Sequence, residues 1–352
     1  MNFFYSRYRH GDISCSLHGL SPGFLHPIIH LGFALEFQQP CLVAESLAAA
    51  CIHDDWPALF LLPTEEYLKS HPETPSATLL EIVEDLRNDP AMRNAVRPAD
   101  PLNKIKDGLL HRVGKELLPY LARYQVDSND AEDIARRAAE TSHMSSYICG
   151  AAQNPKKVEA IDFVLMHMTT LSIFYPTAFI KQDWISNQDK KRLLEFKGRS
   201  DAAMYAGSGC PQLYPERITN YNPKQPNDGW SEIIQRAIKY GDDGHTSKII
   251  RALICAKEAS EPYIGTPGFP LEVGNFLNIA HIVMDSVERM LDPGYFRETE
   301  KVKKFAAEGK GQDAEVVAVI VRWVRWCGME GAWDDYPDLV RNDAQIVNRD
   351  VM

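Results

Sequence analysis

The sequence predicts a mainly α-helical protein, a helical bundle with long loops rich in proline and glycine. Apolar residues recur with the 3.6-residue period of helices along most of the chain, whereas the alternation typical of half-buried strands is scarce. The 352 residues are 45% hydrophobic and 24% charged, an ordinary balance for a globular protein. We therefore expect one domain over residues 1–352, with a core deep enough to hold a site between helices.

Four stretches predict helices in the first half, besides the segment that follows Leu25. Residues 41–53 are rich in alanine and leucine, and residues 77–88 carry an apolar stripe on one face. Residues 130–143 read as a polar helix. Residues 158–174 read as a strongly apolar helix that ends near Pro176.

The second half predicts a helical pair, residues 230–238 and 245–259, around a glycine turn at 241–244. Residues 275–291 and 315–326 complete the helical set. Two stretches rich in proline and glycine are long enough to cover a pocket, residues 205–227 and 261–274.

Composition excludes several classes of protein. The net charge of −10 and the pI near 5.6 argue against nonspecific binding to nucleic acid or to an anionic membrane. No apolar run reaches the length of a membrane span, and the N-terminus has no secretory signal. The seven cysteines form no CxxC pair, which is typical of reduced thiols, so we expect a cytoplasmic protein. The GxGxxA pattern at 309–314 follows no buried strand, so we expect no flavin or dinucleotide fold.

The strongest chemical signal is LHPIIHLG at residues 25–32. It places His26 and His30 four residues apart in an apolar segment, where two rings can share a metal, a cofactor or a substrate oxygen. The simpler alternative is that one ring bonds a backbone carbonyl and the other lies near the surface. Pro27 suits the first helical position, which makes His26 a cap residue and His30 the stronger ligand candidate.

Three further histidines lie in apolar helical segments: His167, His245 and His281. Each alone is more simply a hydrogen-bonded core histidine, whereas several inward histidines in one bundle are typical of a site for iron or another divalent metal. We expect His30, His167 and His245 to converge on one point. Four other histidines have polar sequence neighbours, so we expect them at the surface or at helix ends: His53, His71, His111 and His143.

Lys248 lies one turn after His245 and on the same helix face. A desolvated lysine near a cation loses its proton more easily, and it could then ligate, act as a base, or add carbon dioxide to form a carbamate. The alternative is a surface ion pair with Asp242, Asp243 or Glu232. His245 and Lys248 are thus the candidate catalytic residues.

Other side chains could serve a flat aromatic substrate. Lys197 and Arg199 could bind a phenolate, or could simply form a salt bridge with Asp201. Six aromatic residues could stack on the substrate or could equally be core: Phe33, Phe37, Phe163, Phe174, Tyr175 and Tyr205.

Five motifs occur in order along the chain: LHPIIHLGFALEFQQP (25–40), LMHMTTLSIFYP (165–176), LLEFKGRSDAAMYAGSGCPQL (193–213), GHTSKIIRAL (244–253) and AWDDYPDL (332–339). With them the chain resembles the questin oxidase-like family of fungal polyketide enzymes. The resemblance implies oxygen-dependent oxidation or cleavage of an anthraquinone-type ring, Baeyer–Villiger-like in outcome. It also implies a non-haem iron held by histidines and a modified lysine. His30, His167, His245 and Lys248 match these ligand positions, and His26 matches the motif. NADPH as an external reductant is compatible with this chemistry.

The resemblance has one departure. Family members begin with a further segment that contains an FHNHxxHH-like cluster, and we find nothing similar before LHPIIHLG. We therefore expect one metal ligand and part of the pocket wall to be missing, and an apolar patch to be exposed on residues 25–37. This leaves a truncated gene or a shortened paralogue as explanations. The alternative function is a non-catalytic or degenerate helical binding or accessory protein.

Overall fold

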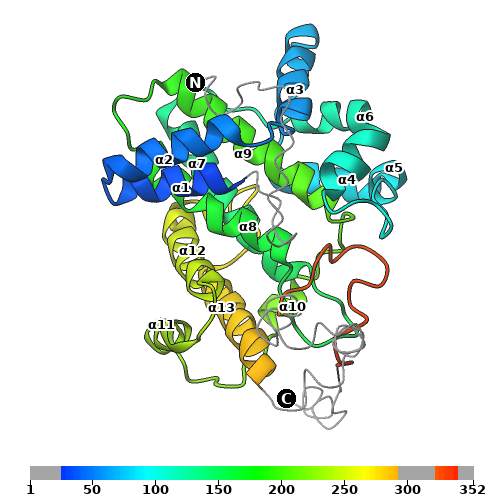
Figure 1. The fold of residues 1–352 in the computed structure, drawn as a ribbon, viewed down its shortest axis with the longest axis vertical. Helices are drawn as coiled ribbons and strands as arrows, with labels where there is room; N and C mark the ends of the chain where they lie inside the picture. The colour runs from blue at the N-terminus through cyan, green and yellow to red at the C-terminus, as the bar shows by residue number, and fades with distance from the viewer. Residues whose placement is uncertain (1–24, 292–321, 340–352) are drawn as a thin grey trace.

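A computed structural model describes residues 25–291 and 322–339, which form a bundle of α-helices (Figure 1). The predicted mainly α fold class is confirmed. The longer helices are α1 (His26–Glu36), α2 (Pro40–Ile52), α3 (Ala58–Ser70), α4 (Leu79–Asn88), α6 (His111–Ala122), α7 (Ala131–Ala151), α8 (Phe163–Ser172), α9 (Asn187–Gly207), α11 (Trp230–Lys239), α12 (His245–Ser260) and α13 (Val273–Glu288). Shorter helical segments are α5 (Pro90–Arg93), η3 (Lys104–Leu110), η4 (Tyr175–Phe179), α10 (Glu216–Thr219), η5 (Glu261–Tyr263) and η6 (Arg289–Leu291).

The apolar helix expected from residue 158 begins only at Phe163, because Asp162 caps it. The Asp162 carboxylate accepts the N–H groups of Val164 and Leu165 at 2.7 and 3.0 Å, which satisfies two of the free donors at the helix start. The residues before the cap are non-helical, and Asp162 forms an isolated parallel bridge with Val324.

The helix expected at 315–326 is not found in its described part. Residues 315–321 lie outside the described residues, and residues 322–326 are irregular. Val324 lies beside the start of α8 and accepts the N–H of Phe163 at 2.7 Å. The segment 322–339 therefore packs beside α8 instead of adding a helix to the bundle.

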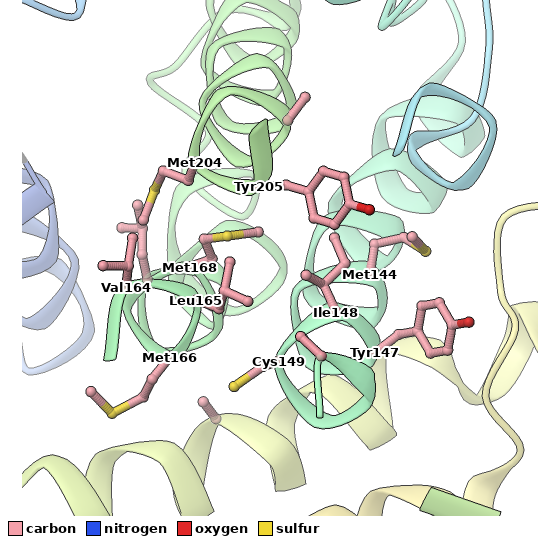
Figure 2. Close-up of a cluster of buried hydrophobic side chains, with 14 of the residues drawn as sticks. Met144, Tyr147, Ile148, Cys149, Val164, Leu165, Met166, Met168, Met204 and Tyr205 are labelled. Carbon is pink, nitrogen blue, oxygen red and sulfur yellow. The ribbon is translucent and has the colours of Figure 1, made fainter. Parts of the chain in front are cut away.

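The core lies between α7, α8 and α9, with α12 packed against both α7 and α8. Figure 2 shows Ile148 of α7 facing Leu165 and Met168 of α8 beside Tyr205 of α9. α7 is longer and more buried than the predicted polar helix. Many of its polar side chains are hydroxyls that donate to carbonyls of preceding turns, for example Ser145 and Ser146, so their burial costs little.

A close approach fixes α1 against the end of α8. A Cβ atom on Gly32 would lie 2.2 Å from Cγ of Phe174, so only glycine fits at this contact. The first turn of α1, with His26, thereby lies beside α8. Leu31 and Ala34 of α1 are buried, whereas Phe37 at the helix end is 57% exposed, so the apolar patch expected on residues 25–37 stays a prediction. None of the described helices is both long and apolar enough to cross a membrane.

Candidate functional site

Three histidines from three different helices lie together beside α8. The ring centroid of His167 on α8 is 5.2 Å from that of His245 on α12 and 6.3 Å from that of His26 on α1. The ring of Phe163, one turn before His167, contacts His167 at 4.5 Å and His245 at 5.3 Å. The bundle thus brings together residues that are far apart in sequence.

A tight turn places His245 as the first residue of α12. Gly244 has φ +88°, a left-handed conformation that favours glycine. The Asp242 carboxylate accepts the N–H groups of Gly244 at 2.8 Å and Thr246 at 3.0 Å and so fixes the turn. Lys248 follows on the same helix face, and its charge contributes to lowering the pKa of His26 and His167.

The Nδ1 atoms of two histidines have partners. Nδ1 of His167 lies 2.7 Å from the carbonyl oxygen of Phe163 in a hydrogen bond, whereas Nδ1 of His245 lies 2.7 Å from Oδ1 of Asp243 at ion-pair distance but without hydrogen-bond geometry. An Nδ1–H that donates to a carbonyl or carboxylate leaves Nε2 with a free lone pair, which is how ligating histidines are commonly held. The pKa of Asp243 is lowered to about 2, first by its bond with His245.

Burial keeps the rings of His167 and His26 neutral. The pKa of His167 falls to about 3, first because the ring is desolvated, and the pKa of His26 is lowered for the same leading reason. Neutral imidazole is the form that binds metals and acts as a base. At neutral pH these two residues are therefore neutral imidazoles and carry no positive charge.

The donor chemistry fits a divalent metal, but the side chains do not form a finished coordination shell. Rings that share a metal at about 2.1 Å have centroids about 5–6 Å apart, close to the distances seen here. Yet within residues 25–291 and 322–339 no group of three or more His, Cys, Asp or Glu is placed to hold a metal ion. Lys248 would complete the donor set only after losing its proton.

His30 does not join these three rings. Its Nε2 lies 3.6 Å from Oε2 of Glu45 on α2, its side chain is 36% exposed, and no ring contact joins it to the other three in the part of the chain described. The expected convergence of His30, His167 and His245 is therefore wrong for His30. His26 takes that place, because Leu25 is the cap and His26 is the first residue of α1.

Two other histidines have local roles. Nε2 of His281 lies 3.0 Å from the carbonyl oxygen of Asp228. His143 is fully buried, which corrects its expected surface position: its Nε2 accepts the N–H of Leu271 at 2.9 Å. Burial lowers the pKa of His143 to about 3. Its polar sequence neighbours gave no sign that its helix would be buried.

Arg325 is a site residue that sequence reasoning missed. Its guanidinium carbon lies 4.3 Å from the centroid of the Phe163 ring, at the edge of the histidine cluster. Two buried nitrogens, Nε and Nη2, have no hydrogen-bond acceptor among the residues that the structure describes. The nearby Asp162 carboxylate already accepts three backbone N–H groups, including that of Cys327 at 2.8 Å. Burial lowers the pKa of Arg325, so this cation is desolvated without full compensation.

Similarity to known proteins covers most of the chain. The family model described as questin oxidase-like matches residues 10–253. The chain is 55% identical to the oxidoreductase AflY of Aspergillus parasiticus, over 91% of this chain and 64% of that protein. It is 35% identical to the Baeyer-Villiger oxidase ptaJ of Pestalotiopsis fici, over 76% of this chain and 60% of that protein. It is 34% identical to the questin oxidase of Aspergillus fumigatus, over 76% of this chain and 61% of that protein. The chain thus spans less than two thirds of the length of each of these relatives.

Proposed function

Because the chain belongs to the questin oxidase-like family, we propose that it is an oxygenase that oxidises or cleaves an anthraquinone-type aromatic polyketide with dioxygen, with a Baeyer–Villiger-like outcome. The names of two relatives, a Baeyer-Villiger oxidase and a questin oxidase, support this reaction class. The observation that carries the proposal is the meeting of His26, His167 and His245, with Lys248 on the same face as His245.

These four residues would hold a non-haem iron. Bound there, iron would supply the electron chemistry that lets dioxygen react with a closed-shell organic substrate, and NADPH from solution could supply reducing equivalents. The contact with Asp243 orients the ring of His245, as the contact with the Phe163 carbonyl orients His167.

The surrounding side chains suit an aromatic substrate with an anionic oxygen. The Phe163 ring offers a flat apolar wall, and the guanidinium of Arg325 above it offers buried N–H donors that lack acceptors in the described part of the chain. An oxyanion bound to these donors would gain charge-assisted hydrogen bonds in a desolvated site. Arg325 would therefore orient the substrate relative to the histidines.

A second candidate is a binding or accessory protein without catalysis. One observation favours it: among the residues that the structure describes, no group of three or more His, Cys, Asp or Glu is placed to hold a metal ion. Both candidates predict binding of an aromatic ligand, so only turnover separates them.

The test uses the full chain loaded with Fe(II), a hydroxyanthraquinone substrate and an oxygen electrode, with mass spectrometry of the product. We expect oxygen uptake and a product that contains added oxygen, both abolished in His245→Ala. A ligand that binds but causes no oxygen uptake would instead establish the binding protein.

A further inference from the structure

The irregular segment 322–328 is tied by backbone hydrogen bonds to the start of α8. The carbonyl oxygen of Val324 accepts the N–H of Phe163 at 2.7 Å. The N–H of Cys327 donates to the carboxylate of Asp162, the cap of α8, at 2.8 Å. Because these two bonds hold adjacent residues, the segment and the first turn of α8 form one hydrogen-bonded unit.

The end of the same segment is fixed as well. The N–H of Gly328 donates to the carbonyl oxygen of Ser208, just after α9, at 2.9 Å, and the indole N–H of Trp333 donates to the carbonyl oxygen of Cys327 at 2.9 Å. Trp326 has φ +60°, a conformation that a residue other than glycine seldom adopts unless surrounding contacts impose it. Contacts on several sides thus hold the segment in one conformation.

Arg322 ties this segment to the turn before α12. Its Nη1 lies 3.3 Å from Oδ2 of Asp242, an ion pair without hydrogen-bond geometry, and the two side chains are only 8% and 3% exposed. The same Asp242 carboxylate accepts the N–H groups of Gly244 and Thr246 at 2.8 and 3.0 Å. These two residues flank His245, so the carboxylate that Arg322 neutralises is the group that fixes the position of this histidine.

We propose that segment 322–328 sets the spacing between the first turns of α8 and α12, and that Arg322 is a positioning residue that holds His245 beside His167 through Asp242. A nearly buried carboxylate without its cation is strongly unfavourable, so loss of Arg322 would let the turn open and carry Asp242 to water. The inference rests on the proposed function for the role of the two histidines. The link between the helices is a property of the metal-free fold.

A general contribution to stability is the competing explanation. The chain offers a matched ion pair, in which Arg112 of α6 donates to Asp100 at 2.7 Å and the two side chains are 25% and 7% exposed. α6 packs mainly against α3 and η3 and not against the helices of the histidine cluster. Loss of either pair should lower stability, but only Arg322 lies on a path to His245.

The first measurement uses the metal-free full chain and follows hydrogen exchange of the Thr246 amide, which donates to Asp242. In Arg322→Met we expect this amide to exchange at least about tenfold faster than in the wild type, because the turn opens locally. In Arg112→Met its exchange rate should equal that of the wild type. Iron plays no part in this measurement.

The second measurement is a double-variant cycle of Fe(II) affinity. Arg322→Met and Asp242→Asn each leave one nearly buried member of the pair without its partner, and each should lower the affinity at least about tenfold. The double variant Arg322→Met/Asp242→Asn carries neither charge, and its affinity should lie within about threefold of the wild type. If one single variant does not fold, the other single variant and the double variant complete the test.

Unchanged exchange of the Thr246 amide in Arg322→Met, or a double variant that binds iron as weakly as the single variants, would overturn the proposal. An equal loss of iron affinity in Arg112→Met and Arg322→Met would overturn it too, because the effect would then be one of general stability. Faster exchange in Arg322→Met, together with a wild type that binds no iron, would support the link between the helices and contradict the proposed function alone.

Discussion

The ring of His167 on α8 and the ring of His245 on α12 lie 5.2 Å apart, and the ring of Phe163 contacts both. This relationship depends on how α12 packs against α8 and not on any local sequence pattern. The site is therefore sensitive to the packing of whole helices, and residues remote from the chemistry should affect it.

Gly32→Ala should disturb the site through α1. The added methyl group would collide with Phe174, and overpacking of this kind lowers the free energy of unfolding by about 1–3 kcal/mol. Displacement of α1 should also move His26 and weaken metal binding. Gly274→Ala is the matched control, because no heavy atom lies within 4 Å of its added Cβ. Equal denaturant midpoints for the two variants would refute the close approach.

Arg325→Met should separate stability from binding. Removal of an uncompensated buried cation should leave the free energy of unfolding unchanged or raise it, while affinity for an anionic aromatic ligand should fall about tenfold. Arg217→Met is the contrast, because Arg217 donates to Glu159 at 2.7 Å and its loss should destabilise the fold. Urea unfolding and ligand titration measure both effects. A strong loss of stability in Arg325→Met would show that the arginine is structural.

Acid should destabilise the protein through His143. The unfolded chain takes up a proton near pH 6.5, whereas the folded chain takes it up only near pH 3, because the buried ring resists charging. The stabilisation is therefore complete above pH 6.5 and is lost as pH falls toward 3, at about 1.4 kcal/mol per pH unit. In His143→Gln the fall of unfolding free energy below pH 6.5 should be shallower by that slope. Urea titrations over this range check it, with exposed His111→Gln as control, and an unchanged slope would contradict the assignment.

Lys248→Ala should lower iron content, and added bicarbonate should not restore it, because the ammonium nitrogen that could ligate or form a carbamate is gone. Lys257→Ala, on the same helix and paired with Glu261 at 2.9 Å, is the matched control. Metal analysis of the purified variants decides the question. Iron loading of Lys248→Ala equal to that of Lys257→Ala would show that Lys248 has no part in the site.

The helices that the sequence predicted best have clear local signals. α4 begins at a capping box of Thr78 and Glu81, and α12 begins after the left-handed turn at Gly244. α9 was not predicted as a helix, because its buried charges, such as Lys197 and Asp201, interrupt the apolar period. Burial of those charges depends on partners in other helices, which periodicity does not reveal.

The sequence predicted which residue types form the site, but not which side chains face it. Periodicity indicated that His26 and His30 lie one turn apart, but it did not show which ring faces α8 and which faces Glu45 on α2. That choice depends on the contact between Gly32 and Phe174. Arg325 was missed for a similar reason, because its segment reads as a helix and is instead an irregular stretch beside Phe163.

The central claim is that His26, His167 and His245, and not His30, form a metal site. Anaerobic titration of the metal-free full chain with Fe(II), followed by calorimetry, tests it most directly. We expect the wild type and His30→Ala to bind one iron with equal affinity. In His26→Ala, His167→Ala and His245→Ala, affinity should fall at least about tenfold. Loss of binding in His30→Ala with retention in His167→Ala, or a wild type that binds no iron, would contradict it.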